Sequence, residues 1–234
     1  MLDSPRTAAR LAGMPEPIQP QILVVDDDAR VRQLQAMDEP QEVLHWYDFI
    51  CPFCYVAQDR TAILARRGIE VVELPFRAHP EIPPGGIRAQ SRVGPMYALL
   101  EREAEEAGLP LHWPPRLPNT LRALEVAEWV RRYQPPAFPR LHKELFAAHF
   151  ALGEDLEDSA VIDRHAGESG VDLTALHAGL ADGSAAARVR ESESVGRKYG
   201  VRGTPAWLMG GRLIEGLRPA VEFERLADHA PNRP

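Results

Sequence analysis

Cysteine is scarce in this sequence of 234 residues, which contains only Cys51 and Cys54. One pair of cysteines cannot supply the several bridges of a small disulfide-stapled domain. With 44% hydrophobic and 26% charged residues, the chain has the composition of an ordinary globular protein. Its length suits one large domain or two small ones. We therefore expect a hydrophobic core of normal size that is stable without disulfide bonds.

Long apolar runs and an excess of positive charge are also missing. No apolar run approaches the roughly 20 residues of a membrane span, and the N-terminal residues lack the apolar stretch of a secretory signal. The net charge of −7 and the pI of about 5.6 disfavour a nucleic-acid partner, because phosphate binding requires clustered positive charge. We expect a cytoplasmic protein that binds neither membrane nor nucleic acid. In that compartment a close cysteine pair is usually catalytic or metal-binding.

The first 40 residues differ from the rest of the chain in composition and in the pattern of apolar residues. Residues 1–21 are rich in proline, arginine and small polar residues, which predicts a flexible extension. The segment ILVVDDDARVRQL, residues 22–34, resembles the opening strand and acidic pocket of a response-regulator receiver domain. The resemblance stops after 13 residues. We interpret residues 1–40 as a flexible extension with a receiver-like remnant at 22–34, dispensable for activity.

From residue 41 onward, the pattern predicts alternating strands and helices. A strand over 43–49, a helix over 51–68 and a strand over 69–76 form a β-α-β unit. Near the end, strands over 206–209 and 212–216 flank Gly210-Gly211, a favoured hairpin loop, and precede a helix over 219–230. The region between them is helical, with helices predicted over 91–108, 120–133, 138–152, 158–168, 172–181 and 184–198. The chain therefore runs β-α-β, helical insertion, β-β-α.

The cysteine pair in YDFICPFCYVA, residues 47–57, allows three interpretations. Inert buried thiols would not need the three-residue offset, the intervening proline and the strand-to-helix junction to coincide. Structural zinc would need two further ligands, and no other cysteine exists. None of the histidines forms an H-x₃₋₅-H pair, and each is expected to be a surface or hydrogen-bonded helix residue; they are His45, His79, His112, His142, His149, His165, His177 and His229. We therefore expect no metal.

A redox couple fits the pattern best. A thiolate at a helix start faces unsatisfied N–H groups and the positive end of the helix dipole, which lowers the thiol pKa. This makes Cys51 the expected exposed nucleophile, with Cys54 more buried one turn later. A C-x-x-C motif beside a β-α-β pattern is typical of thioredoxin-like proteins. The three interpretations remain open at this point, with the redox couple favoured.

A second segment strengthens that interpretation. In GVRGTPAWLMGGRLIEG, residues 200–216, Thr204-Pro205 stands just before a strand. With CPFC upstream, this resembles the cis-proline loop of thioredoxin-fold enzymes. The chain as a whole resembles the DsbA-like oxidoreductases, the FrnE-like branch in particular. The resemblance covers about residues 42–230 and is carried by Asp48, Cys51-Pro52-x-Cys54-Tyr55 and the segments 118–129, 145–158 and 200–208.

This resemblance implies an α/β thioredoxin fold, formed by residues 41–77 and 200–234 and interrupted by an all-helical insertion over 78–199. It implies that Cys51 and Cys54 are catalytic and form a redox-active disulfide. Substrate binding would involve Pro52, Phe53, Thr204 and Pro205. We also expect Asp48 either to relay a proton to Cys54 or to be a solvated or helix-capping aspartate. No cofactor beyond the cysteine pair is implied, although glutathione is a candidate reductant or co-substrate.

The expected function is thiol-disulfide oxidoreduction on protein or small-molecule substrates, with the thioredoxin or glutathione system as electron partner. Two alternatives stay open. One is a glutathione-dependent isomerase or transferase, like the related chromene-carboxylate isomerases and kappa-class transferases, which carry serine at the reactive position. The other is a redox-switched chaperone. The Pro-Phe dipeptide between the cysteines also departs from Pro-His, because phenylalanine cannot donate a hydrogen bond to a thiolate.

Overall fold

The central sheet is built from the two strand pairs that the sequence predicts. The computed structural model describes residues 42–228, so the predictions for residues 1–40 lie outside the described part. Strands β1 (Glu42–Tyr47) and β2 (Glu70–Pro75) pair in parallel, and β1 also pairs antiparallel with β5 (Ala206–Met209). Strand β6 (Arg212–Glu215) completes the order β2-β1-β5-β6. This mixed sheet is the one that a β-α-β unit followed by a β-β-α unit should form.

The hairpin between β5 and β6 forms as predicted. Gly210 and Gly211 connect the strands, with Met209 opposite Arg212. Their φ angles are +54° and +74°, in the left-handed region that a two-residue type I′ turn requires at both positions. Glycine adopts this conformation without the steric cost of a Cβ. The turn therefore fixes the register of the C-terminal strand pair.

The helix predicted over 51–68 is in fact two helices. Helix α2 (Pro52–Val56) ends at Ala57, and α3 (Gln58–Arg66) follows at once. The side-chain amide of Gln58 donates to the carbonyl oxygen of Tyr55 at 2.8 Å, an acceptor that a continuous helix would offer to the backbone. The single-helix prediction was wrong because the spacing of apolar residues does not reveal this competition.

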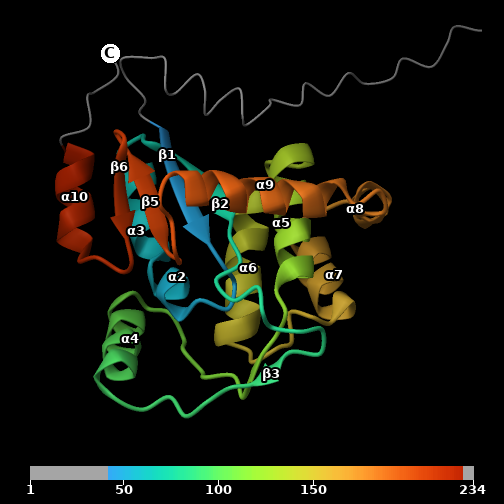
Figure 1. Cartoon of the computed structure of the whole chain (residues 1–234), viewed down its shortest axis with the longest axis horizontal. Helices are drawn as coiled ribbons and strands as arrows, with labels where there is room; N and C mark the ends of the chain where they lie inside the picture. The colour runs from blue at the N-terminus through green and yellow to red at the C-terminus, as the bar shows by residue number, and fades with distance from the viewer. Residues whose placement is uncertain (1–41, 229–234) are drawn as a thin grey trace, which may run out of the picture. The chain divides into compact units, whose positions relative to one another are not determined.

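Helices cover both faces of the sheet (Figure 1). Helices α3 and α10 (Ala220–Asp228) pack on one face, around a core cluster that includes Trp207, Phe223 and Leu64. Helix α9 (Ser184–Lys198) packs on the other face, where the indole N–H of Trp46 donates to the carbonyl oxygen of Ser192 at 3.3 Å. This three-layer arrangement buries the sheet and leaves the C-terminal end of β1 to carry the cysteine motif.

The insertion is helical, as expected, and continues the core of the sheet. A small antiparallel sheet of two strands, β3 (Ile87–Arg88) and β4 (Arg116–Leu117), was not predicted because two-residue strands carry no periodicity. The rings of Phe49 and Phe146 meet edge to face at 4.9 Å, and both belong to a cluster that also holds Cys54. The other insertion helices are α4 (Pro95–Glu106), α5 (Leu121–Tyr133), α6 (Phe138–Phe150), α7 (Ser159–Glu168) and α8 (Leu173–Leu180). The predicted thioredoxin fold with a helical insertion is confirmed.

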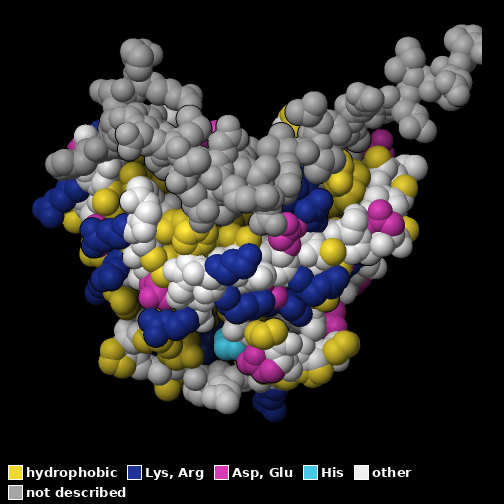
Figure 2. All heavy atoms as spheres, turned by 45° about the horizontal axis from the view of Figure 1, so that its top comes forward, with side chains coloured by type: hydrophobic (Ala, Val, Ile, Leu, Met, Phe, Trp, Pro, Cys, Tyr) yellow, Lys and Arg dark blue, Asp and Glu magenta, His cyan; other side chains and the backbone are white. Residues whose placement is uncertain are grey.

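The surface carries charges of both signs. On the face shown in Figure 2, lysine and arginine side chains alternate with acidic and hydrophobic ones. Among the helices of residues 42–228, none is both long and apolar enough to cross a membrane.

Candidate active site

The two thiols lie where β1 leads into α2. Cys51 occupies the N-cap position with extended backbone angles (φ −82°, ψ 110°), and Pro52 fills the first turn, where a missing N–H is harmless. The backbone N–H groups of Cys54 and Tyr55 donate to the carbonyl oxygen of Cys51 at 3.0 and 3.1 Å. Both cysteines are free thiols in this structure. The helix start therefore holds the pair one turn apart, in the reduced state.

Both thiols are less accessible than expected. Cys51 is 7% exposed and Cys54 is 1% exposed. The expectation that Cys51 is exposed was wrong, because the sequence did not show how closely the residues before Pro205 cover it. The predicted order holds, since Cys54 is the more buried of the two.

The surroundings of the two thiols shift their pKa values in opposite directions. Burial raises the pKa of Cys51, but Cys54 and the Thr204 side chain, which stabilise its thiolate, outweigh this effect, so the pKa lies below the usual thiol value. Burial also raises the pKa of Cys54, and the adjacent Cys51 sulfur raises it further, well above the usual value. When the pair loses one proton, the charge therefore resides on Cys51. The thiolate is the nucleophilic form of cysteine, so these pKa directions make Cys51 the more nucleophilic of the two thiols.

The Thr204–Pro205 loop faces the thiols. Its peptide bond is cis, and the Cys51 thiol donates a hydrogen bond to the carbonyl oxygen of Thr204 at 3.2 Å. The Thr204 hydroxyl is buried and has no hydrogen-bond partner, which leaves it free to donate to a thiolate. Pro205 is buried, and its carbonyl oxygen accepts from the N–H of Gly216 at 2.8 Å. Segments 153 residues apart in the chain thus meet at one sulfur atom.

Asp48 lies beneath the cysteine motif and is fully buried. Its carboxylate accepts hydrogen bonds from the Thr120 hydroxyl at 2.8 Å and from the N–H of Ala78 at 2.7 Å. A longer bond of 3.4 Å comes from the N–H of Ile50. Burial raises the pKa of Asp48 above its usual value, although these hydrogen bonds oppose the rise. The alternative of a solvated aspartate was wrong, since the carboxylate instead ties the β1 end to the insertion.

The remaining predicted substrate-binding residues flank Cys51. Pro52 and Phe53 are both partly buried, and Phe53 packs against the core cluster that contains the thiols. Their side chains therefore form the immediate surroundings of the motif together with the Thr204–Pro205 loop.

Sequence reasoning missed a buried polar cluster behind Cys54. His45 on β1 is 2% exposed, and its Nδ1 lies 2.5 Å from a carboxylate oxygen of Glu73 on β2. His142 on α6 lies 4.0 Å from the same oxygen. The expectation of surface or hydrogen-bonded helix histidines was wrong for His45, which is a strand residue, and for His149, whose two ring nitrogens are buried without partners. The detectable signal was an ionisable residue inside each of two mostly apolar predicted strands, His45 in the first and Glu73 in the second.

The described residues contain no group of three or more histidine, cysteine, aspartate or glutamate side chains that could hold a metal ion.

Comparison with known families agrees with this geometry. Residues 42–229 match the DSBA-like thioredoxin domain. The chain belongs to this family. The match spans both halves of the thioredoxin fold and the insertion between them, whereas the FrnE-like branch stays a prediction. No curated protein matches the chain.

Solved structures share the fold at low identity. A probable DsbA oxidoreductase, SCO1869 from Streptomyces coelicolor, is 24% identical with a TM-score of 0.67, over 81% of this chain and 89% of its own. A 2-hydroxychromene-2-carboxylate isomerase is 23% identical with a TM-score of 0.59, over 75% and 88%. The cytosolic disulfide reductase DsbM from Pseudomonas aeruginosa, solved with GSH, is 15% identical with a TM-score of 0.57, over 80% and 94%. Relatives of this DSBA-like protein in fold thus include oxidoreductases and an isomerase.

Proposed function

We propose that this protein is a thiol-disulfide oxidoreductase in which Cys51 exchanges with substrate disulfides and Cys54 completes the reaction. The observation that carries this proposal is the meeting of Cys51 with Thr204 directly before the cis proline. Cys54 lies one helical turn later, so the Cys51 sulfur contacts the loop and the Cys54 sulfur is placed for the second exchange.

The proposed reduction runs in two exchanges. The Cys51 thiolate attacks one sulfur of a substrate disulfide, forms a mixed disulfide and releases the other sulfur as a thiolate. Cys54 then loses its proton and attacks the Cys51 sulfur, which forms the Cys51–Cys54 disulfide and releases the second substrate thiolate. Two electrons pass from the protein to the substrate. Substrate oxidation is the same sequence in reverse.

We assign substrate contact to the residues around Cys51. We assign an apolar surface to Pro52 and Phe53 and backbone hydrogen bonding to Thr204 and Pro205. An extended substrate segment carries unpaired N–H and C=O groups, which such a loop can pair as a strand edge does. The substrate is therefore a disulfide or thiol in an extended protein segment or a small molecule of similar shape.

The proton of Cys54 needs a buried acceptor. We propose Asp48 for this role, because burial raises its pKa and brings proton uptake nearer to neutral pH. His45 is a second candidate, since it lines the same pocket as Cys54 and its Nε2 has no partner. Asp48→Asn and His45→Phe should be compared by the rate at which Cys54 resolves a preformed mixed disulfide. The relay residue is the one whose loss slows resolution and changes its pH dependence.

The proposed cellular setting is the cytoplasm, with the thioredoxin or glutathione system as electron partner. The fold similarity to DsbM, a cytosolic disulfide reductase solved with GSH, supports glutathione as a reductant. Reference couples range from about −270 mV for thioredoxin to about −120 mV for DsbA. Equilibration of the Cys51–Cys54 pair in glutathione buffers gives its potential and hence its direction. A protein without a reversible couple would not be an oxidoreductase.

Cysteine variants test the division of labour. Cys54→Ser should accumulate mixed disulfides with an insulin substrate, because the second exchange is blocked. Cys51→Ser should be inactive. Near-ultraviolet circular dichroism of both variants controls for folding. Mixed disulfides formed by Cys51→Ser instead would reverse the assignment.

A glutathione-dependent isomerase or transferase is the second candidate, favoured by the fold similarity to 2-hydroxychromene-2-carboxylate isomerase. It predicts isomerisation of 2-hydroxychromene-2-carboxylate in the presence of glutathione, with no net thiol oxidation and little insulin reduction. A redox-switched chaperone predicts suppression of client aggregation that depends on the Cys51–Cys54 state, again with little turnover. These three assays separate the candidates.

A further inference from the structure

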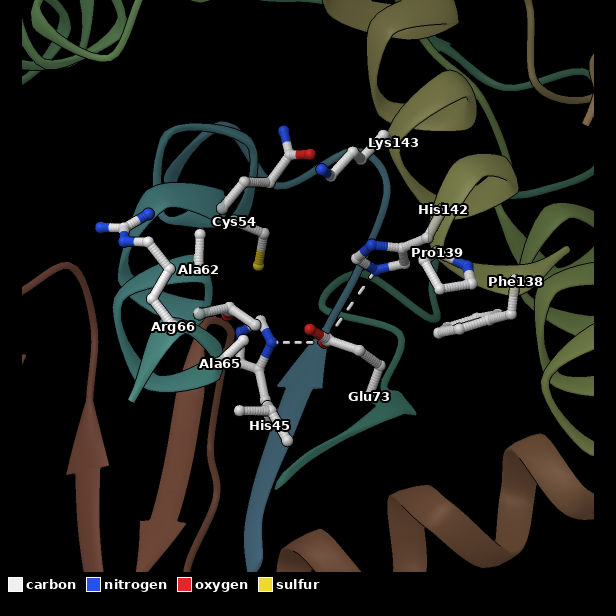
Figure 3. A pocket seen from close by; sticks show the side chains of 13 residues that line it. His45, Cys54, Ala62, Ala65, Arg66, Glu73, Phe138, Pro139, His142 and Lys143 are labelled. Carbon is white, nitrogen blue, oxygen red and sulfur yellow. Dashed lines mark hydrogen bonds and ion pairs between the residues drawn. The ribbon is translucent and has the colours of Figure 1, made fainter. Parts of the chain in front are cut away.

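A pocket of about 520 Å³ lies behind Cys54, between the α2–α3 segment, the β1–β2 strand pair and the start of α6. Figure 3 shows the Cys54 sulfur directed into it, with His45 and Glu73 beside one another and His142 facing them. Neither Cys51 nor Thr204 lines this pocket. It is therefore separate from the side on which the substrate exchanges with Cys51, and its size falls in the range of about 300–1,000 Å³ typical of small-molecule sites.

The floor of the pocket holds polar atoms that lack partners. The Nδ1 of His45 is engaged with Glu73, whereas the buried Nε2 of His45 has no hydrogen-bond partner. The buried Nε2 of His142 has none either. Unpartnered buried polar atoms are rare in proteins, because each loses its hydrogen bonds to water. In the tautomer whose Nδ1–H donates to the carboxylate, the Nε2 of His45 is an acceptor. The floor therefore suits a hydrogen-bond donor, such as a hydroxyl group.

Apolar side chains form the middle of the pocket. Ala62 and Ala65 line it from α3, Phe138 and Pro139 from the start of α6, and Val71 from β2. This lining has no charge of its own and suits an aromatic ring or a similar apolar body.

The surroundings also include two exposed cations. Arg66 from α3 and Lys143 from α6 line the pocket, and both are exposed to solvent. Within residues 42–228, neither forms an ion pair with a carboxylate, in contrast to Arg67, which pairs with Asp228. Two unpaired cations on opposite walls favour an anionic group between them.

We infer that this pocket binds a small organic anion with an apolar body, a carboxylate or sulfonate between Arg66 and Lys143, and a donor group toward His45 and His142. This site goes beyond the proposed thiol-disulfide exchange and does not depend on it. It is a binding site only, and no bond of the ligand changes in it.

The dye 8-anilinonaphthalene-1-sulfonate, which has an apolar body and one anionic group, tests the site on the reduced full-length protein. We expect saturable binding at one dye per chain, seen as enhanced dye fluorescence. Ala65→Trp fills the pocket from an exposed helix position and should weaken binding at least tenfold. Ala187→Trp, on the exposed surface of α9, is the matched control and should bind like the wild type. Equal binding by wild type and Ala65→Trp would overturn the site.

The charge assignment has its own test. N-phenyl-1-naphthylamine is nearly the same dye without the sulfonate, and the wild type should bind it about three- to tenfold more weakly, as expected from two solvent-exposed ion pairs. Arg66→Gln combined with Lys143→Gln should abolish this preference, whereas Arg140→Gln, an exposed arginine of α6 that does not line the pocket, should keep it. A wild type without any preference would overturn the anionic assignment.

The donor assignment is tested by displacement of the bound sulfonate dye. We expect 4-hydroxyphenylacetate to displace it at several-fold lower concentration than phenylacetate, because only the former can donate to the imidazoles on the floor. Equal displacement by the two compounds would overturn this part of the assignment.

Discussion

The Cys51 thiol donates a hydrogen bond to the carbonyl oxygen of Thr204, with 3.2 Å between Sγ and O. The hydroxyl of the same threonine is buried without a partner and is one of the groups that lower the pKa of Cys51. Thr204→Val removes the hydroxyl and keeps the shape. We therefore expect the pKa of Cys51 to rise, seen as a shift of the pH profile of iodoacetamide alkylation to higher pH.

Thr204→Ser is the matched control, because serine keeps the hydroxyl. Its alkylation profile should stay close to that of the wild type. If Thr204→Val and Thr204→Ser behave alike, the backbone carbonyl alone determines the thiol environment and the hydroxyl has no electrostatic role.

The two thiols should differ in the pH at which they react. Burial raises the pKa of both thiols. At Cys51 the neighbouring Cys54 and Thr204 outweigh it and the pKa is lowered, whereas at Cys54 the adjacent Cys51 raises the pKa further, well above its usual value. In the reduced protein near pH 6, alkylation followed by peptide mass spectrometry should find the label on Cys51. Preferential labelling of Cys54 at this pH would contradict the order of the two pKa values.

The sequence predicted the fold well because its signals are local. The β-branched and aromatic residues of the strands, the Gly210-Gly211 turn and the helix end before Gly68 are each local features of a few neighbouring residues. The motif CPFC with Thr204-Pro205 predicted which distant segments meet. The break at Ala57 escaped prediction because it involves a side-chain competitor, Gln58, that periodicity ignores.

The buried polar groups were harder to predict. The burial of Asp48 depends on Thr120, a residue 72 positions away in the insertion, so no local pattern distinguishes it from a solvated aspartate. The pairing of His45 with Glu73 depends on the parallel register of β1 and β2. Register follows from the packing of the whole sheet, which a single sequence does not display.

Asp48→Asn tests the buried carboxylate through the pH dependence of stability. Because burial raises the pKa of Asp48 in the folded state, its contribution is fully present below the unfolded value of about 3.9 and is lost as pH rises through the higher folded value. The variant does not titrate. We therefore expect its free energy of unfolding, relative to the wild type, to increase from pH 4 upward. Urea denaturation at several pH values measures this, and a relative stability that falls with pH would contradict the shift.

Glu73→Gln should show the opposite dependence. Burial alone would raise the pKa of Glu73, but the charges of His45 and His142 and the hydrogen bond of His45 outweigh it, so the folded pKa is lowered. Its contribution is present above the unfolded value of about 4.3 and is lost as pH falls through the folded value. At pH 7 we expect a loss of about 1.5–3 kcal/mol in unfolding free energy, typical of a hydrogen bond to a charged group.

Urea denaturation at pH 7 and below pH 4 should show that this loss shrinks in acid. Glu105→Gln, an exposed glutamate of α4, is the control and should change the stability by less than about 0.5 kcal/mol at either pH. A loss for Glu73→Gln that stays constant with pH would mean that the substitution disturbs packing rather than the ionised pair.

Two helical glycines of the insertion offer a comparison of packing against helix propensity. A Cβ added at Gly179 of α8 would lie 2.6 Å from Cε2 of the almost fully buried Trp129 ring of α5. A Cβ at Gly167 of α7 would meet only Leu173, at the ordinary contact distance of 3.6 Å. Replacing a helical glycine by alanine gains about 0.5–1 kcal/mol in the absence of strain, whereas overpacking costs about 1–3 kcal/mol. We therefore expect Gly167→Ala to raise the unfolding free energy and Gly179→Ala to lower it. Chemical denaturation of both variants measures the two signs, and a stabilising Gly179→Ala would show that the Trp129 ring moves aside at little cost.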